Sequence, residues 1–201
     1  MATIAGSFED WAAGDQARTG VYASEPGVIV RWANEAQLRF ADRSECLQSV
    51  WSPTITSSGN IALPADFLRE IKNRVKWTQT IYLVQLDYPT ANIQTFTSVG
   101  YYSIWNGTFY VWQATSGTPT IPYIKKPTAI TTSTLSSADW DIPTEYQRVL
   151  FNYFDSMMAR RAGDIPGSMT LLSAFDNAAD QAYATFHLKR GAVPVMRGSF
   201  F

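Results

Sequence analysis

The sequence predicts an α+β fold: a small helical bundle of one N-terminal and two C-terminal helices, with an inserted antiparallel β-rich region and an extended C-terminal tail. Apolar residues recur at helical spacing in residues 26–45 and 139–191, which we expect to form one helical core domain. Between them, residues 46–138 alternate apolar and polar side chains and contain repeated turn signals, as strands do. We expect residues 1–25 to form an N-terminal arm and residues 192–201 a separate tail.

The composition limits the classes of protein to which the chain can belong. Of its 201 residues, 46% are hydrophobic and only 16% are charged, against about 25% in an ordinary soluble domain, so we expect partners to cover some apolar surface. The formal net charge of -1 gives no global basic field for nucleic acid. The single cysteine excludes a disulfide framework within the chain. Without a signal peptide or a long apolar run, we expect a soluble protein made in a cytoplasm.

The N-terminal arm carries two aromatic anchors, Phe8 and Trp11, in a segment that glycines interrupt. The first predicted helix begins at Ser24–Glu25–Pro26, because proline suits the first helical position. It ends near Arg43. The apolar face of this helix comprises Val28, Ile29, Trp32, Ala33, Ala36 and Phe40.

The inserted region contains several predicted strands. Residues 47–56 and 61–63 are expected to pair as a hairpin, and Pro64 predicts a tight turn or one helical turn over residues 63–68. Asn106–Gly107 is the strongest hairpin signal in the chain. Further strands are predicted at residues 71–77, 79–86, 99–105, 108–113 and, at the edge of a sheet, 123–129, followed by a Ser/Thr-rich linker at 130–138.

The two C-terminal helices each have a proline at the start and a glycine at the end. We expect the first to run from Pro143 to Gly163 and the second from Ile165–Pro166 to Gly191. Their apolar residues are predicted to belong to the core rather than to a site: Tyr146, Leu150, Tyr153, Phe154, Leu171, Phe175 and Phe186.

The sequence contains no catalytic or metal-binding constellation. His187, the only histidine, has no acid or nucleophile at a useful spacing, so we interpret it as a surface residue or as a partner of the end of its helix. With one histidine and one cysteine, a transition-metal site would need a spaced carboxylate cluster that the sequence lacks. We therefore predict no enzyme activity, no cofactor and no metal.

Aromatic residues are concentrated on both sides of Asn106–Gly107: Tyr101, Tyr102, Trp105, Phe109, Tyr110 and Trp112. Alternate aromatics on a strand can stack on sugar rings or bases, which would make a carbohydrate- or single-strand-binding face. Aromatics also favour strands and fill small β cores. Because no Lys or Arg interleaves with them, we favour the core interpretation.

The order of short motifs resembles one known family. A helix with Asn34–Glu35–Ala36 comes first, and Leu-Pro-Ala-Asp-Phe-Leu-Arg at residues 63–69 precedes the β insertion. Asp141–Ile142–Pro143 and Ile165–Pro166 then open the closing helix pair. This order resembles the head-to-tail adaptor (head-completion or connector) proteins of tailed bacteriophages over residues 26–190, with residues 1–24 as an extension outside the shared pattern.

The resemblance implies a structural virion protein in the neck, between the capsid portal and the tail. Such adaptors form a ring, here expected to be a dodecamer, that binds the portal and tail or nozzle proteins and passes genomic DNA without reading its sequence. The resemblance also implies that the C-terminal tail docks on the portal, through Arg190, Val193, Pro194, Val195, Met196, Arg197, Phe200 and Phe201.

A second set of residues is a candidate interface with neighbouring subunits or the tail: Phe8, Trp11, Tyr101, Trp105, Tyr110 and Trp112. Two other functions stay open at this point. One is a ring-forming tail-tube terminator or stopper, which would sit lower in the neck. The other is a carbohydrate-binding module that uses the aromatic hairpin.

Overall fold

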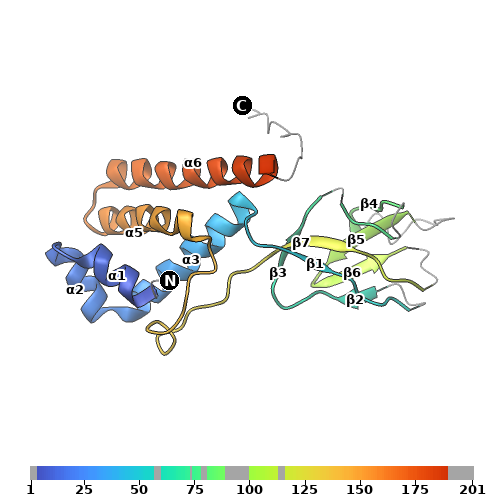
Figure 1. Cartoon of the computed structure of the whole chain (residues 1–201), viewed down its shortest axis with the longest axis horizontal. Coiled ribbons are helices and arrows are strands. Elements are labelled where there is room, and N and C mark those ends of the chain that lie inside the picture. Colours follow the sequence, from blue (N-terminus) through green and yellow to red (C-terminus); the bar gives the residue numbers. More distant parts are fainter. Residues whose placement is uncertain are drawn as a thin grey trace. The chain divides into compact units, whose positions relative to one another are not determined.

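The computed structural model describes residues 4–56, 60–72, 74–77, 81–88, 100–112 and 116–189. The chain divides into two compact units. The helical unit combines Met1–Leu47 with Lys126–Phe201, and the β unit is Gln48–Lys125. The predicted α+β class is confirmed, because helices form the first unit and mainly antiparallel strands the second (Figure 1).

The helical unit contains α1 (Ile4–Ala12), α2 (Gln16–Ser24), α3 (Pro26–Ser44), a short 3-10 helix η1 (Thr144–Tyr146), α5 (Gln147–Arg161) and α6 (Ile165–Lys189). Helices α5 and α6 lie side by side, and α3 packs against both (Figure 1). Two bidentate ion pairs join α3 to α6, because Arg39 donates to Asp176 and Arg43 donates to Asp180. None of the described helices is long and apolar enough to cross a membrane.

The ends of the helices follow from local chemistry. Asp15 caps α2 by accepting from the backbone N–H groups of Ala17 and Arg18, at 2.9 and 3.0 Å. Pro26 occupies the first turn of α3 as predicted. Gly163, with φ of 83°, stands after α5, because a residue in the left-handed region commonly closes a helix.

The predicted N-terminal arm instead forms α1 and α2, which are part of the helical core. Ile4, Phe8 and Trp11 are buried, and the Phe8 ring centroid lies 4.9 Å from that of Phe154 on α5. Sequence periodicity misses these helices because each is short and helices of this length depend on tertiary packing. The aromatic side chains of α1 supply that packing.

The core predicted for the C-terminal helices is largely confirmed. Leu150, Tyr153, Phe154 and Phe175 are buried, whereas Tyr146 and Phe186 are partly buried and pack against this core. Leu171 is half-buried. The predicted linker also contributes, since Ile130 and Leu135 are buried and Asn34 exchanges two 2.8 Å hydrogen bonds with the Ile130 backbone. A segment rich in Ser and Thr can therefore close one side of the bundle.

The β unit consists of two small sheets. The first has the order β1 (Gln48–Trp51), β7 (Ile121–Lys125), β3 (Phe67–Glu70). The second has the order β2 (Asn60–Ala62), β6 (Thr108–Val111), β5 (Tyr101–Trp105), β4 (Val84–Gln85). All of these pairs are antiparallel except β4–β5, which is parallel.

Several predicted strand partners are wrong. Residues 47–56 and 61–63 do not form a hairpin with each other, because β1 pairs with β7 and β2 pairs with β6. The tight turn predicted at residues 63–68 is present, because the Phe67 backbone N–H donates to the Pro64 carbonyl at 3.0 Å, but the strand β3 that follows it and pairs with β7 was not predicted. The strand predicted at 123–129 to be an edge is the centre of its sheet. In each case the partner is distant in sequence, and local patterns carry no information about it.

The predicted hairpin at Asn106–Gly107 is confirmed. These two residues have φ of 45° and 72° and join β5 to β6, as the mirror-image turn of a two-residue hairpin requires. Of the two strands predicted at 71–77 and 79–86, the described residues form only β4 and isolated bridges between Lys76 and both Tyr82 and Thr120. The buried centre of the β unit contains Ile55, Val75, Leu83, Tyr102, Phe109, Val111 and Ile121.

Candidate interaction surfaces

The β5–β6 hairpin separates its aromatic residues onto two faces. Successive side chains of a strand point to opposite sides, so Tyr102 and Phe109 enter the core of the β unit, with ring centroids 5.4 Å apart. Trp105, Tyr110 and Trp112 belong to the other face and lie outside this core cluster. The core interpretation therefore holds for Tyr102 and Phe109 and fails for the other four aromatic residues of the set.

Three of these four residues, Trp105, Tyr110 and Trp112, lie together with Tyr88. We call these four side chains the aromatic surface. The Tyr88 ring is stacked at 5.9 Å from Trp105 and lies 4.5 Å from Tyr110 and 5.9 Å from Trp112. The Trp112 indole N–H donates to the Ser103 hydroxyl at 3.3 Å, and that hydroxyl donates to the Leu86 carbonyl at 2.7 Å. These bonds hold the rings in place, and Trp105 remains 50% exposed.

Desolvation and the neighbouring Tyr110 phenol raise the pKa of Tyr88. The Tyr88 phenol therefore stays protonated near neutral pH, and the aromatic surface offers stacked rings with polar edges. Such rings are enriched where proteins bind other proteins, and they also bind sugars. Sequence reasoning missed Tyr88, because it lies outside the hairpin.

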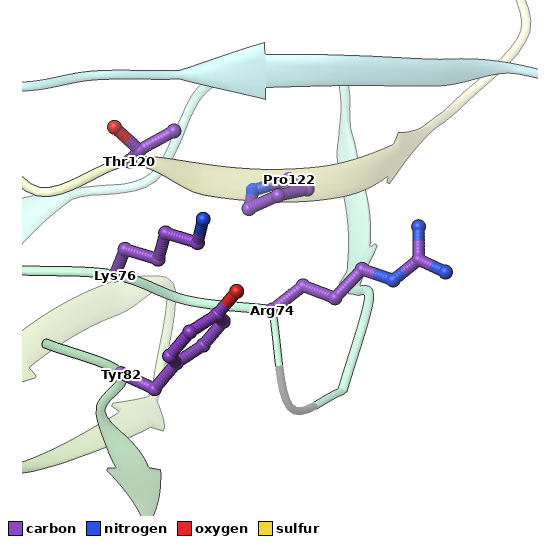
Figure 2. A pocket seen from close by; sticks show the side chains of 5 residues that line it. All are labelled: Arg74, Lys76, Tyr82, Thr120 and Pro122. Carbon is purple, nitrogen blue, oxygen red and sulfur yellow. The ribbon is translucent and has the colours of Figure 1, made fainter. Parts of the chain in front are cut away.

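A second feature of the β unit is a shallow cavity of about 520 Å³, lined by Arg74, Lys76, Tyr82, Thr120 and Pro122 (Figure 2). Lys76 is hydrogen-bonded through its backbone to Thr120 and bridges to Tyr82 on its other side. The Lys76 ammonium lies 4.7 Å from the centroid of the Tyr82 ring, and the Arg74 side chain extends toward the other end of the cavity (Figure 2). We call these five residues the basic pocket.

Large apolar side chains are exposed around both features of the β unit. Ile81, Tyr82 and Val84 are 42%, 55% and 57% exposed. Val50 on β1 is exposed as well. Exposed apolar groups are ordinary when single, but three of them within four residues, here on both sides of the buried Leu83, are typical of a surface that binds a partner.

The predicted interface residues fall into three groups. Phe8 and Trp11 contribute to the helical core, where the Trp11 indole N–H donates to Asp155 at 2.9 Å; Phe8 is fully buried, whereas Trp11 also lines a surface cavity. Tyr101, Trp105, Tyr110 and Trp112 are half-buried or exposed on the β unit. The predicted portal-binding residues, from Arg190 to Phe201, lie outside the described residues.

His187 is not a surface residue, contrary to prediction. It is buried on α6, and its Nε2 lies 3.0 Å from a carboxylate oxygen of Glu45, which follows α3 with φ of 54°. In the sequence we looked for an acid on the same helix as His187, whereas its partner Glu45 stands at the end of α3. None of the contacts described for His187 joins it to a second acid or to a nucleophile. We therefore assign the contact between His187 and Glu45 a role in stability.

No group of three or more His, Cys, Asp or Glu side chains in the described part of the chain could hold a metal ion. Cys46 lies next to Glu45 and is partly buried; burial raises the pKa of its thiol, which suits a packing role rather than a reactive one. The structure has a helical unit interrupted by a β unit whose exposed side chains include aromatic, apolar and basic ones. These features are typical of a protein that binds other proteins.

Comparison with known families specifies the class. The family model described as SU10 adaptor protein matches residues 1–197. The chain therefore belongs to the SU10 adaptor protein family, a family of bacteriophage head-to-tail adaptors, and it is a structural component of the virion. The match includes residues 1–24, which were predicted to lie outside the shared pattern. No curated protein matches the chain.

Proposed function

We propose that this protein is the subunit of a ring, a dodecamer, that bridges the portal and the tail in the neck of the virion and continues the channel for DNA. The observation that carries the proposal is the adaptor family match over residues 1–197. The exposed apolar and aromatic side chains of the β unit support it, because a ring subunit needs surfaces that neighbours cover. The net charge of -1 suits a channel that passes DNA without retaining it.

Within this proposal, the aromatic surface contacts a neighbouring subunit or a tail protein. Trp105 is half-exposed and held against Tyr88, so its ring is pre-ordered and loses little side-chain entropy on binding. Ordered aromatics of this kind are frequent centres of protein interfaces.

The C-terminal tail, residues 192–201, docks on the portal. Its sequence combines Pro194, which restricts the unbound chain, with Met196 and the apolar pair Phe200 and Phe201. A stiff segment that ends in two aromatic rings is suited to fill a groove of another protein.

Reconstitution with the cognate portal tests the proposal. The full chain should form portal-bound rings in negative-stain micrographs, and mass photometry should give their copy number. Deleting residues 192–201 should abolish attachment to the portal while the circular dichroism spectrum stays unchanged. Attachment that survives the deletion would refute docking through the tail.

The exposed Trp105 also allows a sugar-binding role. A substitution of Trp105 distinguishes this role from the adaptor ring. Trp105→Ala should weaken ring formation or tail attachment and leave retention on glycan arrays at background. A stable monomer that binds glycans through Trp105 and ignores the portal would replace the adaptor ring with a carbohydrate-binding role.

A further inference from the structure

The two units carry opposite net charges. The β unit, Gln48–Lys125, contains five Lys or Arg and three Asp or Glu, a net charge of +2. The rest of the chain contains eleven Lys or Arg and fourteen Asp or Glu, a net charge of -3. Two copies of this chain can therefore attract each other when the β unit of one meets the helical unit of the other.

The positive charge of the β unit is concentrated near the basic pocket. Arg69, Lys72, Arg74 and Lys76 are four of its five cations and lie within eight residues. The side chains that line the pocket offer an ammonium, a guanidinium, a phenol and a hydroxyl group, and the described lining residues include no carboxylate. Every charged group of the lining is a hydrogen-bond donor, so the pocket suits an anionic group.

The surroundings indicate a protein carboxylate rather than a nucleic-acid phosphate. Tyr82 lines the pocket and is exposed, and Ile81 and Val84, close to it in sequence, are exposed as well. Surfaces that track a phosphate backbone are polar and strongly basic, whereas protein interfaces combine Arg with aromatic and aliphatic side chains. The mixture found here is of the second kind.

Most acidic side chains of the helical unit already have a partner within it. Asp176 and Asp180 pair with α3, Glu25 with Arg161, and Asp155 with Arg18. Glu9 and Asp10 on α1 are exposed and form no ion pair among the described residues, as is also true of Asp139 and Glu145; what sets Glu9 and Asp10 apart is that they are neighbours on one helix.

Asp10 also lines a cavity of about 490 Å³, together with the rings of Trp11 and Phe151. An apolar side chain of a second copy, such as that of Ile81 or Tyr82, could enter this cavity. The carboxylates of Glu9 and Asp10 would then meet the cations of that copy's basic pocket. Arg148 lines the same cavity and would repel the cations, so the test below changes Glu9 and Asp10 and leaves Arg148 and the two rings unchanged.

We infer that the basic pocket of one copy receives the acidic α1 surface, Glu9 and Asp10, of the next copy. This inference rests on the proposed ring. The contact joins two different surfaces, so its repetition builds a ring where the rotation closes, as the proposed function requires, rather than a two-fold dimer.

Charge reversal of the full chain tests the contact on its cognate portal. The double variant Arg74→Glu, Lys76→Glu should form about tenfold fewer complete rings than the natural chain in negative-stain images, because each pair becomes repulsive. Adding Glu9→Lys and Asp10→Lys to the same chain should restore the rings. Lys72→Glu is the matched control, since Lys72 is exposed in the same segment and does not line the pocket.

Cross-linking provides a second measurement. In a Cys46→Ser background, Lys76→Cys and Asp10→Cys in one chain should form disulfide-linked oligomers on oxidation, and either cysteine alone should not. If the Arg74→Glu, Lys76→Glu variant forms as many rings as the natural chain does, this inference alone is overturned. Intact rings with weaker DNA retention would overturn it in favour of a nucleic-acid contact. Failure of the natural chain to form any ring on the portal would overturn the proposed function and this inference together.

Discussion

At the scale of single residues, buried polar contacts hold the helices together. Glu45 follows α3 in a left-handed conformation and lies 3.0 Å from His187 on α6, whose ring centroid is 4.1 Å from that of Tyr183. Ser156 and Ser168 form another buried contact, at 3.2 Å, between α5 and α6. A buried polar group that loses its partner keeps its full desolvation cost, so these contacts matter more than surface ion pairs.

We expect Glu45→Ala to destabilise the protein by about 1–3 kcal/mol, because His187 is then left buried without the carboxylate. The alanine keeps the left-handed backbone, so the change isolates the side-chain contact. Urea denaturation followed by circular dichroism measures the free energy of unfolding. Glu9→Ala is the control at an exposed site and should change stability by no more than about 0.5 kcal/mol. Equal effects of the two substitutions would contradict the assignment.

Glu70 on β3 gives a prediction about pH. It is buried, and burial raises the pKa of its carboxyl, so the folded state favours the protonated form. The stability from this neutral form is fully present below the unfolded pKa and is lost as the pH rises through the folded pKa. Glu70→Gln keeps a neutral side chain at every pH, so its unfolding free energy relative to the natural chain should increase from about pH 4 to pH 7. A difference that is constant across this range would argue against the assignment.

At the scale of elements, two glycines with different backbone conformations should respond in opposite ways to the same substitution. Gly107 has φ of 72° in the β5–β6 turn, whereas Gly20 lies within α2 with open space around its Cα. We expect Gly107→Ala to cost about 1–2 kcal/mol of stability, because a Cβ is disfavoured there. Gly20→Ala should add about 0.5–1 kcal/mol, since alanine favours helices. Thermal denaturation of both variants checks the signs, and a shift in the same direction for both would refute this reasoning.

The elements also show which features local sequence can predict. Asn106–Gly107 determines its turn through backbone conformations that few other residues adopt, and Pro26 marks a helix start for a similar reason. Pro64 likewise predicts the tight turn that its carbonyl closes with the Phe67 N–H, whereas the strand β3 that follows was not predicted, because it depends on β7 lying beside it. Within the candidate site, the hairpin aromatics were foreseen, whereas Tyr88, Arg74 and Tyr82 meet their neighbours only through long-range pairing.

At the scale of the whole molecule, the two chain connections between the units belong to one pair of strands, β1 and β7. β1 pairs with β7, with Gln48 opposite Ile124, so the two connections lie side by side where they join the helical unit. Opposed residues of an antiparallel pair are about 5 Å apart, a gap that a few residues can span. Each unit has a separate hydrophobic cluster.

We therefore expect the helical unit to fold without the β unit. Replacing residues 49–123 by a short Gly/Ser linker should give a helical circular dichroism spectrum and a single cooperative thermal transition. The full chain is the reference, with its own transition measured at the same pH and concentration. A molten spectrum without a cooperative transition would show that the helical core needs the β unit.

By itself, the sequence determined the α+β class, the helices α3, α5 and α6 and the central hairpin, because helical period, prolines and glycines act within a few residues. It also carried motifs that resemble the adaptor family, to which the chain belongs. Only the tertiary structure decided that the first residues join the core through Phe8, which strand lies beside which, and that Glu45 meets His187. These depend on contacts between residues far apart in the chain, whose partners become near neighbours only after the chain has folded.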